Sequence, residues 1–420
     1  MTTMHAPRQI RGRPGTGQLS PARRTAPAAP RQVAFWLTAL VLGVTMAGTT
    51  LPTPLYVIYQ DRWHLSTAMV TVTFAAYAAA VLATLLLAGR SSDETGRRPV
   101  MAVALAASAL STVLFILAPD VGALIAARIV SGLSAGLMTG TATATLTELI
   151  PASARRRASL AATAANMGGL GLGPLVAGLF AQYAPYPTTL VFEVYLAVLA
   201  AAALILLLVP ETVRPRTRPT LRFAGLGIPE RGRAEFIAAA VAAFAAFALL
   251  GLFSSLVPGF IGDTLHEGSH AFQGAVVFLL LATGTVTQVI LSRFSSRRVV
   301  LAGLGLFLAA LALIAAALAE AAMALFLAGT VAGGVAVGAI FLGSLATASR
   351  LAPAGRRGHA ISAFFVACYA GLIIPVIGVG VLSEGTGTFP AVLTFSALLS
   401  LLCLFSITRI ARIASPSEPA

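Results

Sequence analysis

Two ionisable residues, Arg128 and Glu193, lie inside long apolar stretches of the sequence, where charged side chains are rare. Glu193 is the only acidic residue well inside such a stretch. Burial and a neighbouring arginine shift the pKa of a carboxyl group in opposite directions, so a pair of this kind can take up and release a proton. The same two residues could instead form a structural ion pair. Both hypotheses require Arg128 and Glu193 to lie close together.

A second pattern, His266-Glu267-Gly268-Ser269-His270, spells H-E-x-x-H. Zinc peptidases use this string on a helix, with both histidines on one face holding the metal and the glutamate acting as a base. Here a glycine and a serine interrupt any helix, and no third ligand is evident elsewhere in the sequence. We interpret the string as a coincidence and expect no metal, no cofactor and no enzymatic activity. A membrane zinc peptidase remains only as a remote alternative.

A third group of charges lies in the short segment 89–99, between two apolar stretches that are each about as long as a bilayer-spanning helix. Glycine and proline are expected in such a turn, because chain that leaves lipid must satisfy its backbone polar groups elsewhere. An ordinary basic loop would need only Arg97 and Arg98. Asp93, four residues before Arg97, therefore indicates a more specific interaction.

The composition identifies the solvent in which these residues act. The chain has 420 residues, of which 58% are hydrophobic and only 10% are charged. Soluble domains carry about 25% charged residues, so this chain is built for a lipid bilayer. The net charge of +14 would suit nucleic acid. However, the arginines occur in segments that alternate with nearly uncharged ones, which is the positive-inside pattern of a multi-span protein. We therefore expect no nucleic-acid partner.

The apolar stretches predict an all-α membrane protein of about twelve transmembrane helices in two six-helix bundles with pseudo-twofold symmetry. The two halves repeat weakly at an offset of roughly 200 residues, as in many transporters. The expected spans are 33–57, 70–89, 100–119, 121–147, 159–182, 189–209, 236–260, 271–291, 299–319, 322–347, 360–382 and 391–407. The expected domains are a disordered basic tail (1–31), a first bundle (32–209), a cytoplasmic linker (210–235), a second bundle (236–408) and a second tail (409–420), with both termini cytoplasmic.

The pattern G-x-x-x-D-x-x-G-R-R-P of residues 89–99 resembles the signature loop between helices two and three of the major facilitator superfamily. In that family the loop latches the two halves of a transporter on the cytoplasmic side. A carboxylate at the end of span four joins it there, and Glu148 stands at that place. The resemblance implies a cytoplasmic gate made of Gly89, Asp93, Gly96, Arg97, Arg98 and Glu148.

Two further patterns are similar to motifs of the same family. Arg128 followed by Gly132 is similar to the span-four motif that the family links to proton coupling. The glycine-rich stretch 168–178 resembles the antiporter motif of span five, in which a proline bends the helix and glycines provide a smooth packing surface. The residues that carry the span-five resemblance are Gly169, Gly173, Pro174 and Gly178.

The resemblance implies a secondary transporter similar to bacterial twelve-helix drug–proton antiporters. We expect proton-coupled efflux of a small amphipathic molecule from the inner membrane, by a monomer. A proton-coupled importer of a metabolite is the alternative, because one fold hosts many functions. The sequence identifies neither the substrate nor the coupling ion.

Overall fold

The computed structural model describes residues 30–89, 91–213, 225–263, 265, 267–353 and 357–412, and these residues form helices without strands. The first half contains α1 (Arg31–Thr50), α2 (Tyr56–Trp63), α3 (Thr67–Ala88), α4 (Ser91–Thr95), α5 (Arg97–Leu117), α6 (Val121–Glu148), the short 3₁₀ helix Ala152–Ala154, α7 (Arg155–Tyr183) and α8 (Leu190–Leu206). The second half contains α9 (Arg233–Ser255), α10 (Val257–Asp263), α11 (His270–Leu291), α12 (Ser296–Ala319), α13 (Met323–Leu351), α14 (Arg357–Thr386) and α15 (Thr388–Arg412).

Side chains just before the first helical residue fix where several of these helices begin. The hydroxyl of Ser66 accepts a hydrogen bond from the backbone N–H of Met69, and Asp120 caps α6 through the N–H of Ala123 at 2.9 Å. Each cap satisfies one of the orphan N–H groups at a helix start, which matters most where a helix enters lipid. The caps therefore help to fix where these helices begin.

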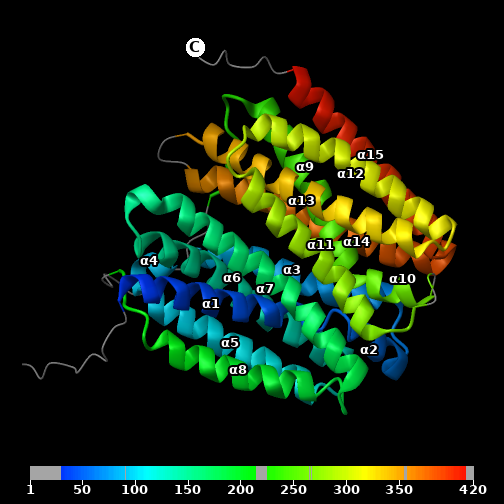
Figure 1. The fold of residues 1–420 in the computed structure, drawn as a ribbon, viewed down its shortest axis with the longest axis horizontal. Coiled ribbons are helices and arrows are strands. Elements are labelled where there is room, and N and C mark those ends of the chain that lie inside the picture. Colours follow the sequence, from blue (N-terminus) through cyan, green and yellow to red (C-terminus); the bar gives the residue numbers. More distant parts are fainter. Residues whose placement is uncertain are drawn as a thin grey trace, which may run out of the picture.

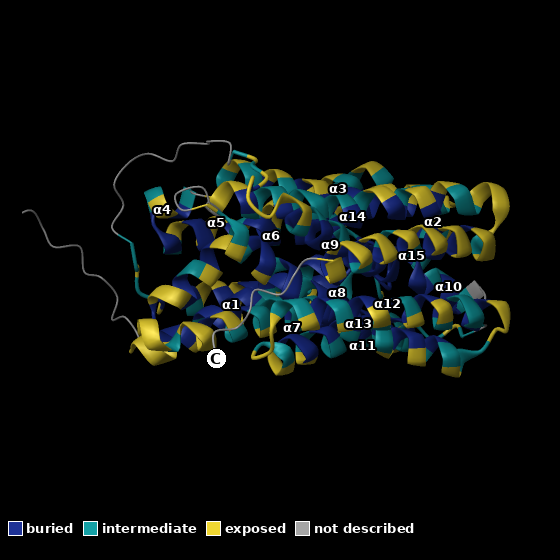
Figure 2. Ribbon diagram, turned by 90° about the horizontal axis from the view of Figure 1, so that it is seen from above, coloured by how far each residue is buried: buried dark blue, intermediate teal, exposed yellow. Residues whose placement is uncertain are grey.

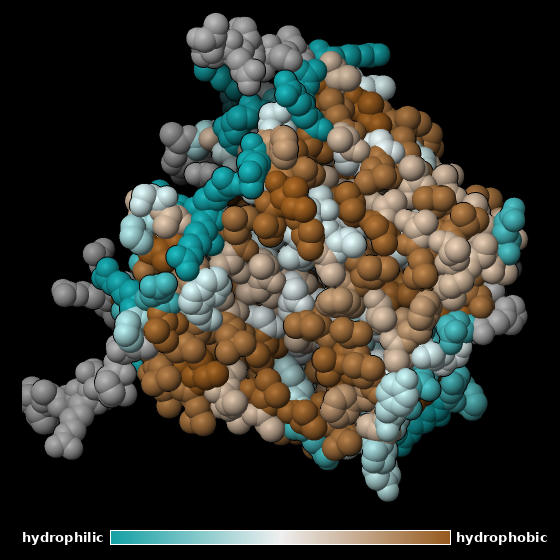
Figure 3. All heavy atoms as spheres, in the orientation of Figure 1, coloured by the Kyte–Doolittle hydropathy of each residue, from teal (hydrophilic) through white to brown (hydrophobic). Residues whose placement is uncertain are grey.

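The predicted all-helical fold of two six-helix bundles is confirmed, and Figure 1 shows the two halves side by side. Eleven helices of the described residues are long and apolar enough to cross a membrane, and Leu190–Leu206 is a shorter apolar helix of 17 residues. Hydrophobic side chains cover the middle of the molecule in Figure 3, while hydrophilic residues gather toward its two ends. This distribution fits a bilayer across the middle.

The first helix of each half is broken, which the predicted continuous spans 33–57 and 236–260 missed. The chain leaves α1 at Thr50 and resumes as α2 at Tyr56, while α9 ends at Ser255 just before α10. Prolines follow each break, and a proline removes a helix hydrogen bond and clashes with the preceding turn. Both halves therefore carry a short helix, α2 or α10, at the same end of the molecule (Figure 1).

We call the end that carries α2 and α10 the α2 end, and the opposite end, which carries α4, the α4 end. The halves are joined by α2 with α10 at the α2 end, by α3 with α14, and by α7 with α11. Two hydrogen bonds at the α2 end join the halves: the N–H of Ala68 donates to Glu384 at 2.9 Å, and the N–H of His270 donates to Gln182 at 2.9 Å. At the α4 end, Arg156 donates to Ser292 at 3.1 Å.

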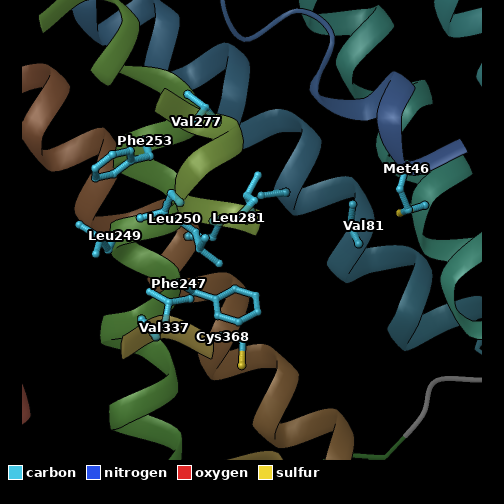
Figure 4. Packing of buried hydrophobic residues seen from close by; sticks show 14 of the residues in the cluster. Met46, Val81, Phe247, Leu249, Leu250, Phe253, Val277, Leu281, Val337 and Cys368 are labelled. Carbon is cyan, nitrogen blue, oxygen red and sulfur yellow. The ribbon is translucent and has the colours of Figure 1, made fainter. Parts of the chain in front are cut away.

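Buried residues fill the space between the helices, and exposed residues cover the outside (Figure 2). In the second half, α9 is the most enclosed helix, because α13, α14 and α15 all pack against it. Figure 4 shows its side chains Phe247, Leu249, Leu250 and Phe253 within this core, near Cys368 of α14. The core thus continues from one helix to the next without a separate soluble domain.

The expected tails and linker are only partly described. Residues 1–29, 214–224 and 413–420 lie outside the described residues. Beside them, α1 begins at Arg31, α9 begins at Arg233, and α15 continues to Arg412.

Candidate functional site

The structure brings together Asp93, Arg97 and Glu148, the three charges that the signature loop was expected to collect. The guanidinium of Arg97 lies 2.6 Å from Asp93 Oδ1 and 2.7 Å from Glu148 Oε1. It also donates to the second oxygen of Glu148 at 3.3 Å and to the hydroxyl of Ser92 at 2.6 Å. We call these four residues, with Glu211 described below, the arginine cluster.

Local structure explains this geometry. Asp93 lies on α4 and Arg97 is the first residue of α5, so the turn between them places the two side chains one helical turn apart. Glu148 is the last residue of α6. Arg97 is only 7% exposed, whereas the neighbouring Arg98 is half-buried and makes no ion pair among the described side chains. The two arginines are therefore not equivalent.

Glu211 is a member of the cluster that the sequence analysis missed. Its carboxylate accepts hydrogen bonds from the backbone N–H groups of Arg97 at 2.8 Å and Arg98 at 3.0 Å. It thereby caps the N-terminus of α5, where the orphan N–H groups and the helix dipole favour a negative charge. The only signal in the sequence was an acidic residue directly after span six, beside an arginine-rich linker.

Gly96 makes this cap possible. Its φ of +103° lies in the region that side chains disfavour. A Cβ at this position would stand 2.8 Å from Oε2 of Glu211. The second glycine of the motif, Gly89, ends α3 in an ordinary helical conformation. The spacing of the motif therefore serves both the backbone turn and the approach of Glu211.

The arginine cluster ties together elements of one half only. Its members come from α4, α5, α6 and the segment after α8, and the hydroxyl of Thr212 donates to Glu148 at 2.5 Å. The expected latch between the two halves is not visible in these contacts. Among the described residues, the cluster instead fixes the α4 end of the first half as one unit.

Replacing Arg97 with Gln should lower the free energy of unfolding by about 2 kcal/mol, because several charge-assisted hydrogen bonds disappear around partly exposed carboxylates. Arg98→Gln makes the same change in charge and should alter stability by less than about 0.5 kcal/mol. Denaturant unfolding of the purified proteins in detergent compares the two. Equal losses would mean that net charge, not the cluster, stabilises this end.

The expected span-five residues pack on two different partners. Gly169 and Gly173 face α1 of the same half, where an added Cβ would collide with the backbone oxygens of Gly43 and Ala47. Glycine is therefore needed for α1 and α7 to approach this closely.

Pro174 and Gly178 face the other half. A Cβ on Gly178 would lie 2.5 Å from the backbone oxygen of His270 and 3.2 Å from the Cα of Gly274. In turn, a Cβ on Gly274 would collide with the carbonyl of Pro174. The contact between α7 and α11 is thus a backbone-to-backbone contact at the α2 end, where larger side chains would hold the halves apart.

Gly178→Ala should shift the population toward conformations in which α7 and α11 are separated at the α2 end, since the new methyl group has no room in the closed contact. Spin labels on cysteines at positions 183 and 268 would report longer distances by pulsed electron resonance. Gly168→Ala on the same helix is the control, because nothing lies within 4 Å of the added Cβ. An unchanged distance distribution in Gly178→Ala would show that this contact does not limit closure.

Arg128 lies deep inside the first half and is 1% exposed. Its guanidinium donates to the backbone oxygen of Thr49 at 2.5 Å and stands 4.4 Å from the ring centre of Tyr77 and 5.7 Å from that of Phe74. Placing a cation at membrane depth costs about 2.5–3.5 kcal/mol on insertion scales. The attraction between the guanidinium and the aromatic faces offsets part of this cost. Gly132 lies one turn further along α6, against the backbone of Tyr77. Because glycine has no side chain, α3 can pack closely on α6 at this point.

The expected pairing of Arg128 with Glu193 is wrong. Glu193 is exposed in the first turn of α8, and no ion pair of the described residues joins it to Arg128. The error arose because the prediction used depth along a helix without knowing which face the residue occupies. Glu193 points away from the bundle, whereas Arg128 points into it.

The H-E-x-x-H string is split by the start of α11. His270 is the first residue of that helix, Glu267 lies in the preceding loop, and His266 is outside the described residues. The ring of His270 interacts with Gln273 at 3.3 Å, and the carboxylate of Glu267 accepts from the N–H of Ser269. Within the described residues, no group of three or more His, Cys, Asp or Glu side chains could hold a metal ion.

Comparison with known proteins agrees with this architecture. The family model described as Major Facilitator Superfamily matches residues 38–374. The chain therefore belongs to the major facilitator superfamily, and it is a multi-pass membrane transporter of that fold. It is 29% identical over 382 residues to a protein described as the uncharacterized MFS-type transporter YceJ of Bacillus subtilis (strain 168), covering 88% of this chain and 94% of the relative.

Solved structures share the fold at low sequence identity. A D-xylose–proton symporter matches with a TM-score of 0.70 and 16% identity, over 90% of this chain and 96% of that one. A bacterial homologue of the human lysosomal transporter Spinster, in an inward-facing and unoccupied conformation, matches with a TM-score of 0.69 and 14% identity, over 92% and 99%. The human organic anion transporter MFSD10 matches with a TM-score of 0.64 and 17% identity, over 90% and 100%.

Proposed function

We propose that this transporter exports a small amphipathic molecule across a bacterial inner membrane by alternating access, with protons as the coupling ion. The observation that carries the proposal is the contact between α7 and α11, in which Pro174 and Gly178 meet Gly274 across the two halves. A smooth glycine surface lets two packed helices slide or separate without withdrawing interlocked side chains. It is also the stretch that resembles the antiporter motif.

The orientation follows from the arginines. Apart from the buried Arg128, those of the described residues lie mainly at the α4 end, with Arg62 on α2 at the opposite end. By the positive-inside rule we assign the α4 end to the cytoplasm, together with both termini. In this orientation the hydrogen bonds of Ala68 with Glu384 and of His270 with Gln182 join the halves on the outer side.

A group of aromatic side chains in the second half supports an amphipathic cargo. Phe247 lies 5.4 Å from Phe341 and 6.0 Å from Tyr369, measured between ring centres in the second half. Tyr369 lies on α14, which packs against α3 of the first half. A surface of this kind binds apolar or weakly polar groups through ring contacts, with few polar groups to fix orientation.

Expression of the protein in a host that lacks its own efflux pumps should raise resistance to at least one amphipathic compound several-fold in a susceptibility screen. Energised inverted vesicles should then accumulate that compound. An empty vector is the control for the host background. If the protein instead makes cells more sensitive and vesicles release the compound faster, the importer alternative holds and export is wrong.

Coupling to protons can be tested separately at Glu193. Because this side chain is exposed, Glu193→Gln should leave expression and pH-driven export unchanged within about twofold, as for other surface substitutions. Quenching of a pH-sensitive dye in proteoliposomes measures the proton movement that accompanies transport. Loss of uphill export with retained downhill exchange would restore Glu193 as the proton carrier.

A further inference from the structure

We propose that Arg128, Tyr56 and Tyr59 form a binding site for the carboxylate of an organic anion. The inference rests on the proposed function, because it names the chemical class of the molecule that the transporter carries. The three residues come from α2 and α6, and all of them are buried: Arg128 is 1% exposed and each tyrosine 2%.

The polar atoms of these residues are donors that lack an acceptor. Nε of Arg128 and the hydroxyls of Tyr56 and Tyr59 have no hydrogen-bond partner among the described residues. Tyr56 and Tyr59 lie one helical turn apart on α2, and Arg128 binds the carbonyl of Thr49, shortly before α2. The Tyr56 hydroxyl lies beside Arg128, and its own O–H remains without an acceptor. Buried polar groups are normally paired, so three adjacent orphans indicate a missing partner.

The chemistry of the missing partner is that of an anion. A tyrosine phenol ordinarily titrates at about pH 10, so both residues keep their O–H groups at neutral pH. Two O–H donors and one guanidinium N–H together favour a negatively charged acceptor, and a carboxylate has two oxygens with several lone pairs. The aromatic faces of Tyr77 and Phe74 stabilise the cation but accept none of these hydrogen bonds.

The described part of the chain does not supply that anion. None of its Asp or Glu side chains is buried, and Arg128 takes part in no ion pair there. Unpaired charges at membrane depth are strongly unfavourable and commonly mark substrate or ion pathways. The countercharge of Arg128 therefore comes from a bound molecule.

The position of the site fits cargo better than a fixed ion. The ring of Tyr77 lies against Arg128, and Tyr77 belongs to α3, which packs against α14 of the other half. An anion held by Arg128 would thus lie near the contact of α3 with the other half. The short helix α2 covers the site in this conformation and contacts α10, so binding is linked to closure at the α2 end.

The experiment uses purified full-length protein in nanodiscs, with Trp36→Phe as the background so that Trp63 is the single tryptophan. Trp63 stacks on Tyr59, with ring centres 5.1 Å apart, and so reports on the site by fluorescence. The probes are cyclohexanecarboxylate, its neutral amide, cyclohexylmethylamine and sodium chloride. We expect saturable binding of the carboxylate, and at least about tenfold weaker binding of the amide and the amine.

Tyr56→Phe and Tyr59→Phe each remove only an unpartnered hydroxyl, so the proteins should fold with unchanged stability. Each should bind the carboxylate about tenfold more weakly. Tyr195→Phe is the matched control, because its buried hydroxyl is already bonded to Ser108 and to the backbone of Val44, at 3.1 Å each. That variant should lose some stability and keep its affinity.

Equal binding of carboxylate and amide, no binding of the carboxylate, or full affinity in both Tyr56→Phe and Tyr59→Phe would overturn the inference. A Trp63 response to chloride with none to the carboxylate would mean an inorganic-anion site and would also overturn it. Export of neutral or cationic compounds only, with no anion binding, would leave the proposed function intact while this inference fails. Anion binding without any export would support this inference while the proposed function fails.

Discussion

The cost of placing charge and unpaired polar groups in hydrocarbon governs this structure. Two charged side chains of the described residues are buried, Arg97 and Arg128, and each is stabilised by different neighbours. Arg97 lies at the membrane edge, where Asp93, Glu148 and Ser92 surround its guanidinium. Arg128 lies deeper and has aromatic rings and one backbone carbonyl. Complete pairing makes the first a structural centre, and incomplete pairing leaves the second open to a ligand.

Lipid also changes how helices are held together. Without a hydrophobic force between spans, close backbone approach provides much of the attraction, and glycine is the residue that permits it. The glycines of α7 serve two interfaces: Gly169 and Gly173 join α7 to α1 within one half, whereas Gly178 joins it to α11 of the other. One helix therefore belongs to the rigid bundle along one face and to the moving interface along another.

The sequence predicted the class, the number of spans and most of the arginine cluster, because each rests on local signals. Apolar runs have the length of a bilayer, and Asp93 and Arg97 are one helical turn apart. The sequence did not predict which face of its helix Glu193 occupies. It also did not predict the contact of Glu211 with Arg97, because these residues are far apart in the sequence. Breaks in the first helix of each half were also missed, although Pro52 and Pro258 were visible.

The linker between the halves is attached to the folded protein on both sides. At its start, Glu211 and Thr212 bind the arginine cluster of the first half, and further on the N–H of Gly227 donates to the backbone oxygen of His359 on α14 at 3.3 Å. The chain from 213 to 227 can extend to at most about 50 Å, far more than packed helices move when halves rock. The length of the connection alone therefore sets no limit on how far the two halves can move relative to each other.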